Sequence, residues 1–268
     1  MGIKSFIKKS PLISKVAYNY LFGRLAKSQQ LQNKSEMKRI SGLKGKYSGK
    51  RCFIIGTGPS LTVADLEMLS DEYTFATNRI YELFDRTEWR PTFYVNQDHN
   101  LIQKFGNRIK KVEAELLFLP VDYKEKFVGE KYRFFVLKHK EFYPHKAPFS
   151  LDISKYLAQG FTVTYGAIQI AIYMGFKEIY LLGIDHNYNI SRDAKGRPVR
   201  QEQLGNSYAA GMQSYVNMNN LPRIEETSVA YKTAEEVSKK LGVKIYNATR
   251  GGKLEVFERI QLEKVLED

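Results

Sequence analysis

The sequence of 268 residues has a single cysteine, Cys52, and no long apolar run. One cysteine cannot form an internal disulfide, which favours a reducing compartment. A membrane-spanning helix needs about 20 consecutive apolar residues. The amino terminus also lacks the continuous apolar core and the small-residue cleavage site of a secretory signal. The sequence therefore predicts a cytoplasmic protein.

Several catalytic motifs are missing as well. There is no Gly-x-Ser-x-Gly elbow of a serine hydrolase, and no glycine-rich loop carries the lysine of a P-loop nucleotidase. Closely spaced His and Cys residues do not occur, and no predicted strand is followed by an Asp-x-Asp pair. We therefore expect no bound metal and no resident cofactor.

Acidic residues are scarce at the amino end. Residues 1–50 hold 12 Lys or Arg and one acid, Glu36, for a net charge of +11, whereas the rest of the chain carries 30 basic and 28 acidic groups. The basic character therefore belongs to the amino-terminal segment. The body has no basic and aromatic platform, so we expect no nucleic acid partner.

Within residues 1–30, apolar residues recur at helical spacing among the lysines. The spacing predicts two short amphipathic pieces, broken near Pro11. Such a segment can lie on an anionic bilayer, which would place the protein at the inner face of the membrane. Packing of the apolar stripe on the body, or on a second subunit of a homo-oligomer, gives the same pattern. Residues 28–46 read as a linker, so we expect an amino-terminal unit over 1–46.

From residue 47 to 268, apolar runs alternate with helical patterns. Strands are expected at 51–55, 74–76, 92–95, 115–119, 133–137, 179–182 and 243–246. Helices are expected at 62–70, 100–111, 164–175, 225–241 and 254–265. This alternation predicts an α/β, Rossmann-like domain with a doubly wound, mostly parallel sheet. Residues 187–224 do not continue this alternation of strand and helix patterns, which predicts a lid-like loop.

The segment Gly56-Thr57-Gly58-Pro59-Ser60-Leu61 directly follows the apolar run Cys52–Ile55. The run predicts a buried parallel strand. Two glycines allow a close turn before the next helical pattern, so the N–H groups of the turn would face a ligand above the sheet. The arrangement predicts a phosphate-binding loop. The alternative is a turn that only ends the strand and binds no ligand.

Polar residues also follow three other predicted strands, at 77–79, 96–99 and 183–188. Ligands of open parallel sheets bind above the carboxyl ends of the strands, so we expect these segments to converge on one crevice. Alternatively, Asn78 caps a turn and Asp185 begins the next element. His99 and His186, each directly after an Asp, are further candidate site residues. Small residues from 162 to 167 open a predicted helix, where they could hold an anion or simply cap the helix.

Motifs in this order and spacing resemble two related families. The resemblance is carried by residues 54–61, 74–81, 93–96, 164–185 and 241–246. These segments are similar to the bacterial sialyltransferases of glycosyltransferase family 42, which use CMP-activated sugars. They also resemble proteins like the archaeal 6-hydroxymethylpterin pyrophosphokinase, many of which serve surface-glycan biosynthesis. The resemblance implies a glycosyltransferase that moves a sugar, CMP-linked, onto a surface-polysaccharide or lipid-linked acceptor such as capsule or lipopolysaccharide.

The resemblance also implies roles for individual residues. The nucleotide phosphate and ribose would be bound by Gly56, Thr57, Gly58 and Ser60. The donor phosphate and sugar would contact Asn78 and Asn96, and the carboxylate or sugar end would contact Thr164, Tyr165 and Gly166. The cytosine and ribose would be bracketed by Gly183, Ile184 and Asp185. Hydrogen bonds to the leaving phosphate, a role that a divalent metal takes in other enzymes, would come from Tyr188 and Tyr208.

The chain departs from the sialyltransferase pattern at the general base. Those enzymes place a histidine in the lid region, and residues 187–230 contain none. An inverting transfer needs a base near the acceptor hydroxyl, and the candidates are Asp185, His186, Glu225 and Glu226. Two other functions stay open: a Mg²⁺-dependent diphosphokinase acting on a pterin-like alcohol, and a nucleotide-binding protein without catalytic activity.

Overall fold

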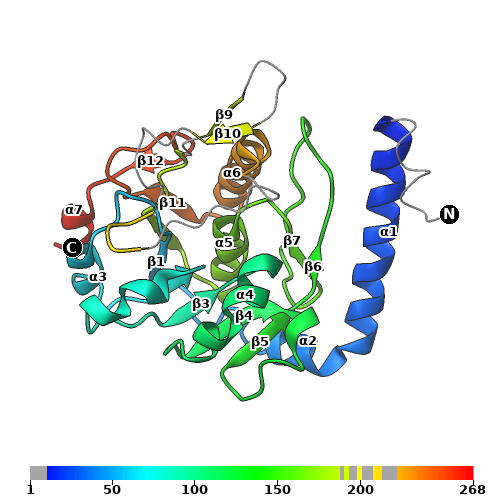
Figure 1. Cartoon of the computed structure of the whole chain (residues 1–268), viewed down its shortest axis with the longest axis horizontal. Helices are drawn as coiled ribbons and strands as arrows, with labels where there is room; N and C mark the ends of the chain where they lie inside the picture. Colours follow the sequence, from blue (N-terminus) through cyan, green and yellow to red (C-terminus); the bar gives the residue numbers. More distant parts are fainter. Residues whose placement is uncertain (1–10, 188–189, 193–197, 201–207, 213–221, 268) are drawn as a thin grey trace.

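The computed structural model describes residues 11–187, 190–192, 198–200, 208–212 and 222–267. Its main sheet has eight strands with helices on both faces (Figure 1), and all neighbouring strands are parallel. In spatial order the strands are β12 (Glu258–Arg259), β11 (Lys244–Asn247), β8 (Glu178–Leu182), β1 (Arg51–Ile55), β2 (Thr74–Thr77), β3 (Phe93–Val95), β4 (Leu116–Pro120) and β5 (Tyr132–Phe135). The predicted Rossmann-like, doubly wound α/β fold is confirmed.

Strand β1 runs through the middle of the sheet and is buried on both faces. Cys52 and Ile54 point into one apolar core, whereas Phe53 and Ile55 point into the other. Because helices cover both faces, the strand reads as a continuous apolar run instead of an alternating one. Cys52 has no exposed surface, and burial raises the pKa of its thiol.

Two helical layers form these cores with the sheet. On the face of Ile54 lie α2 (Lys34–Ser41), α5 (Val163–Met174) and α6 (Ile224–Lys240). On the face of Phe53 lie α3 (Val63–Glu67), η3 (Ile80–Arg86), α4 (His99–Lys110) and α7 (Leu262–Leu266). The remaining elements are η4 (Val121–Tyr123), a parallel pair of β6 (Leu137–Lys138) and β7 (Leu157–Ala158), and an antiparallel pair of β9 (Ile190–Arg192) and β10 (Pro198–Arg200).

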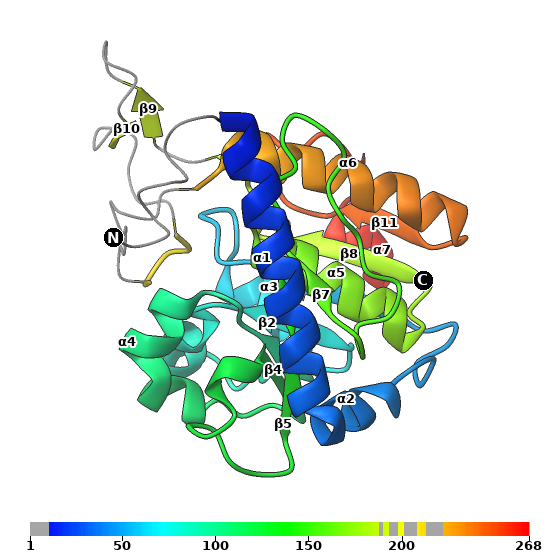
Figure 2. The ribbon, with the colours of Figure 1, turned by 90° about the vertical axis from the view of Figure 1, so that its right-hand side faces the viewer.

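Helix α1 (Pro11–Gln32) stands beside these layers, with its carboxyl end next to α2 (Figures 1 and 2). Its inner side contacts the segment after β6. Asn19 exchanges two hydrogen bonds with the backbone of Glu141, at 3.2 and 2.9 Å, and Phe22 packs edge-on against His139 with ring centroids 5.3 Å apart. None of the described helices has the length and apolar character needed to cross a membrane.

Two expected elements were wrong. Residues 28–46 are not an extended linker, because α1 continues to Gln32 and α2 follows at Lys34, with Ile40 buried in the core. The helix expected at 254–265 is replaced by a loop, the short strand β12 and the short helix α7. Most of the lid expected at 187–224 lies outside the described residues. Its described parts are residue 187, β9, β10, residues 208–212 and residues 222–224.

Gln169 of α5 joins three segments inside the core. Its side chain has no exposed surface. The amide oxygen accepts hydrogen bonds from Ser150 N at 2.9 Å and Ala158 N at 3.0 Å. The amide nitrogen donates to Ala158 O at 2.9 Å and to Tyr165 O at 3.1 Å. One side chain therefore satisfies both polar groups of Ala158 and holds β7 against the start of α5.

We expect Gln169→Leu to lower the free energy of unfolding by about 3 kcal/mol, because it leaves buried backbone groups without partners. Urea unfolding followed by circular dichroism measures this change. The matched control is Gln32→Leu on the exposed side of α1, where we expect a change of less than about 0.5 kcal/mol. Equal effects of the two substitutions would contradict the role given to Gln169.

Candidate functional site

The strand order reverses between β1 and β8, at the centre of the sheet. From β1 the chain proceeds through β2, β3, β4 and β5 on one side, while β8, β11 and β12 lie on the other. In open parallel sheets such a switch point leaves a crevice at the carboxyl ends of the strands, where ligands bind. Residues 56–62 and 183–187, which follow β1 and β8, therefore form the base of the candidate site.

The glycines after β1 are required by the loop after β8. A Cβ at Gly58 would overlap Asp185 Oδ2 and lie 2.7 Å from Gly183 O, and a Cβ at Gly56 would lie 2.5 Å from Gly183 O. The N–H groups of Gly56 and Gly58 donate to Leu182 O at 2.8 Å and to Gly183 O at 2.9 Å. These two donors therefore bind the neighbouring loop and do not face a ligand.

Asp185 ties the two loops together through Ser60. Its Oδ2 accepts hydrogen bonds from Ser60 Oγ at 2.8 Å and from Ser60 N at 3.4 Å. Burial raises the pKa of the Asp185 carboxyl, and the hydrogen bonds from Ser60 oppose that rise. Asp185 is 8% exposed, and its partner Ser60 lies in the loop after β1. Asp185 therefore fixes the loops after β1 and β8 relative to each other.

A third segment, after β11, holds the β8 loop from the other side. Thr249 Oγ1 accepts a hydrogen bond from Ile184 N at 3.1 Å, and Lys253 N donates to Asp185 O at 2.7 Å. Gly252 has a positive φ of 74°, and a Cβ there would lie 2.7 Å from Asp185 O. Sequence reasoning missed these residues. The glycine pair Gly251-Gly252 behind the last predicted strand is the signal that could have found them.

The ends of β2 and β3 meet through Tyr94. Its hydroxyl donates to Asn78 O at 2.5 Å and accepts from Asn96 Nδ2 at 3.1 Å. Asn96 Oδ1 accepts from Asp98 N at 2.9 Å, and Asn96 has no exposed surface. Asn96 therefore orders the end of β3. By contrast, Asn78 has a positive φ of 52°, and its Oδ1 is buried without a hydrogen-bond partner.

Gln97 is a second residue with an unused buried acceptor, which the sequence did not single out. Its Oε1 is buried and has no hydrogen-bond partner. The same atom would lie 2.9 Å from a Cβ at Gly166, so the missing side chain of Gly166 lets the amide approach α5. The carboxyl ends of β2 and β3 are thus each followed by a buried amide oxygen without a hydrogen-bond partner.

The start of α5 faces the same edge, but most of its side chains point inward. Thr162 caps the helix by accepting from Thr164 N at 3.4 Å. Thr164 is 3% exposed and Tyr165 has no exposed surface. The Tyr165 hydroxyl donates to Pro148 O at 2.8 Å. Gly166 is buried as well, and it is the residue of this predicted group that the Gln97 amide approaches.

His186 lies where the β8 loop meets the first turns of α6. Its backbone has a positive φ of 48°, its ring packs edge-on against Tyr231 at 5.6 Å, and its Nε2 lies 2.8 Å from Ser228 Oγ. Because the Ser228 hydroxyl donates to Ile224 O at 2.9 Å, it accepts from Nε2–H of His186, which leaves the imidazole lone pair on Nδ1. Burial lowers the pKa of His186, which favours the neutral form of the ring.

The two candidate glutamates at the start of α6 differ in environment. Glu225 is exposed. Glu226 forms an ion pair with Arg223 at 2.7 Å, and Arg223 also pairs with Glu141 at 2.7 Å and stacks over Phe161 at 3.8 Å. Glu226 is therefore held in a network that connects α6 to the segment after β6.

Of the two predicted lid tyrosines, the structure describes Tyr208 alone. Tyr188 lies outside the described residues. Tyr208 is half-buried, and the Arg79 guanidinium lies 5.3 Å over its ring. The next residue, Ala209, donates through N to Thr57 O at 2.9 Å. Part of the expected lid thus packs directly on the glycine turn, which brings Tyr208 to the same edge as Thr57.

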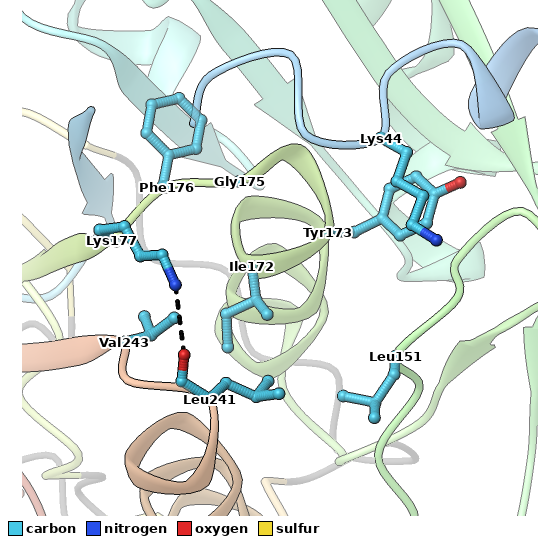
Figure 3. Close-up of a pocket in the computed structure, with 9 residues that line it drawn as sticks. All are labelled: Lys44, Leu151, Ile172, Tyr173, Gly175, Phe176, Lys177, Leu241 and Val243. Atoms are coloured by element: carbon cyan, nitrogen blue, oxygen red, sulfur yellow. Dashed lines mark hydrogen bonds between the residues drawn. The ribbon is translucent and has the colours of Figure 1, made fainter. Parts of the chain in front are cut away.

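A hollow of about 220 Å³ lies at the other end of α5 (Figure 3). Its lining includes the apolar side chains of Ile172 and Val243 together with Lys44 and Lys177. Lys177 Nζ donates to Leu241 O at 3.2 Å. This hollow is at the amino-terminal edge of the sheet and contains none of the predicted site residues, so it is separate from the candidate site.

The sheet and its helices define an α/β protein with a Rossmann-like fold, and a comparison with known proteins identifies its family. The profile of the family described as 6-hydroxymethylpterin diphosphokinase MptE-like matches residues 28–191. This match spans more than half of the chain, which therefore belongs to the MptE-like family. A search of curated proteins found no match.

Among solved structures, the MAf glycosyltransferase from Magnetospirillum magneticum AMB-1 is similar to this chain. The superposition has a TM-score of 0.49 and a sequence identity of 16%, and it covers 85% of this chain and 38% of that protein. The chain thus corresponds to well under half the length of that larger protein.

We expect Gly58→Ala to lower the free energy of unfolding by about 1–3 kcal/mol, because the new methyl group forces the β1 and β8 loops apart. Thermal or urea unfolding measures the loss. The matched control is Gly23→Ala on α1, where a Cβ meets nothing within 4 Å and where alanine favours helix by about 1 kcal/mol. A stable Gly58→Ala protein would contradict the close packing of the two loops.

Proposed function

We propose that this chain is a glycosyltransferase that binds a nucleotide-activated sugar, CMP-linked, at the carboxyl edge of the sheet. The acceptor would be a surface-polysaccharide or lipid-linked glycan. The observation that supports donor binding most directly is the pair of buried, unpartnered amide oxygens of Asn78 and Gln97. Buried polar atoms are nearly always hydrogen-bonded, so these two acceptors favour a ligand rich in N–H or O–H groups, such as a nucleotide sugar.

The donor would lie over the loops joined by Ser60 and Asp185. Their hydrogen bond at 2.8 Å fixes the floor of the crevice before a ligand arrives, which reduces the ordering cost of binding. Tyr208 and Thr57 would close the crevice from the β1 side, because Ala209 N is bonded to Thr57 O. Tyr188 remains a proposed contact of the leaving phosphate.

Among the four candidate bases, we favour His186. Asp185 is engaged by Ser60 and Glu226 by Arg223, and Glu225 is exposed to solvent. His186 is half-buried, oriented by Ser228 and neutral because burial lowers its pKa. A neutral, oriented imidazole is the usual form of a general base. We assign that role to His186.

The proposed reaction is one direct displacement. The acceptor oxygen forms a bond to the anomeric carbon while the bond from that carbon to the phosphate oxygen breaks. His186 takes the proton of the acceptor hydroxyl, and CMP leaves with the bonding electron pair. Attack opposite the leaving group inverts the anomeric centre.

The family description favours a second candidate, diphosphate transfer from ATP to a pterin-like alcohol. This reaction uses Mg²⁺ to neutralise the transferred phosphates. In the described part of the chain, no three His, Cys, Asp or Glu side chains gather into one group. The two candidates differ in nucleotide and in metal dependence, so ligand binding separates them.

We expect CMP to raise the thermal stability of the protein without Mg²⁺, by about 2.7 kcal/mol at 100 times the dissociation constant. A thermal-shift series with CMP, CDP, UDP, GDP and ATP, each with and without Mg²⁺, measures this effect. Asn78→Ala and Gln97→Ala should each weaken CMP-sugar binding by about tenfold, as loss of one buried hydrogen bond costs about 1–1.5 kcal/mol.

Asn107→Ala, on the exposed side of α4, is the matched control and should bind as the wild type does. Stabilisation by ATP only in the presence of Mg²⁺ would favour the diphosphokinase instead. If no nucleotide stabilised the protein, both candidates would be rejected.

The proposed base predicts a pH dependence. Because burial places the pKa of His186 below its ordinary value of 6.5, the active neutral form persists at neutral pH, and kcat falls only as the pH drops through that lowered pKa. His186→Asn should remove this acidic limb and lower kcat by about 10²–10⁴-fold. The profile of CMP-sugar hydrolysis or transfer against pH measures both changes.

His145→Asn, at an exposed histidine, is the control and should keep the limb and the rate. If Glu225→Gln or Glu226→Gln removed the limb while His186→Asn kept it, the base would be the glutamate.

A further inference from the structure

We propose that the outer face of α1 docks the protein onto an anionic lipid bilayer. We define this outer face by the exposed residues Val16, Tyr20, Leu21, Arg24, Leu25, Lys27 and Leu31. Among the described residues, ten large apolar side chains are exposed, and five of them lie on this one helix. The inference concerns a surface and does not depend on which nucleotide the site binds.

The helix is fixed to the body through its other side, and within the described part of the chain the outer face packs against no other element. Lys15, Asn19 and Phe22 contact the segment after β6, and Gln29 Nε2 donates to Asp122 Oδ1 at 2.9 Å. Val16 is 68% exposed and Tyr20 is 64% exposed. A stripe of large apolar side chains in water is costly, which points to an apolar surface that covers it.

The positive charge of α1 indicates that the apolar surface covering this stripe is an anionic bilayer. Positions 16, 20, 24, 27 and 31 follow helical spacing, so Arg24 and Lys27 lie in the same stripe as the apolar side chains. No Asp or Glu occurs before Glu36, and residues 1–10 add three lysines. Two such faces packed against each other would bring like charges together, whereas an anionic lipid surface attracts every one of them.

The contacts of α1 connect this face to the candidate site. Asn19 is hydrogen-bonded to the backbone of Glu141, and the Glu141 carboxylate forms two hydrogen bonds with Arg223 at 2.7 and 2.8 Å. Arg223 lies directly before α6, whose Ser228 contacts His186. In both views the amino-terminal end of α1 lies towards the end of the molecule that carries β9 and β10 (Figures 1 and 2). Docking through α1 would therefore fix the carboxyl edge of the sheet relative to the bilayer, where a lipid-linked acceptor would be presented.

The test is co-sedimentation of the full chain with vesicles. We expect binding to vesicles of phosphatidylcholine mixed with phosphatidylglycerol and little binding to phosphatidylcholine alone. Arg24→Gln combined with Lys27→Gln should lower the partition coefficient about 30-fold, because each basic residue near the surface contributes about 1 kcal/mol. Tyr20→Ser combined with Leu31→Ser should lower it at least about tenfold.

The matched controls change the same residue types elsewhere on the surface. Lys232→Gln with Lys240→Gln alters the net charge equally on the exposed side of α6, and Val128→Ser with Leu151→Ser removes exposed apolar groups outside α1. Both controls should bind vesicles as the wild type does, and circular dichroism verifies that all variants are folded. Loss of binding in the α6 pair equal to that in the α1 pair would overturn the proposal. So would a concentration-dependent dimer in sedimentation velocity that the α1 apolar substitutions abolish.

Discussion

The contact between the loops after β1 and β8 determines where every other part of the site can lie. Because Gly56 and Gly58 have no side chains, the backbone of Gly183 approaches closely, and the Asp185 carboxylate reaches Ser60. The segment after β11 and residue Ala209 then pack on this pair of loops. Four chain segments thus meet at this edge of the sheet, and packing and hydrogen bonds among them fix their relative positions.

Much of the fold could be predicted, because strands covered on both faces must be apolar along their whole length. Strands such as β1 and β8 carry that signal. Helices such as α4, α5 and α6 were predictable from their helical patterns between the strands. Elements of few residues do not: β12 spans two residues and α7 five. The segment 28–46 reads as polar, and its helical character depends on single residues such as Ile40 reaching the core, which local composition does not reveal.

The location of the site could be predicted from the sequence. The contacts that its side chains make could be predicted less well. Topology brings the polar strand ends to one edge, so residues near 56, 78, 97, 166 and 185 could be expected together. Whether an amide is free or engaged depends on neighbours distant in sequence. Asn96 is engaged by Tyr94 and Asp98, whereas the adjacent Gln97 has an unused acceptor. Glycine in a turn is equally ambiguous, because close packing and phosphate contact both require it.

Cys52 gives this architecture an internal reporter. It is the one thiol of the chain, it has no exposed surface, and it lies on the central strand four residues before the glycine turn. A thiol reagent therefore reaches it only when the middle of the sheet opens, and the raised pKa slows reaction further. The rate of labelling of the unmodified protein consequently reports the opening of β1 from its neighbours, separately from any fluctuation of α1 or of the surface loops.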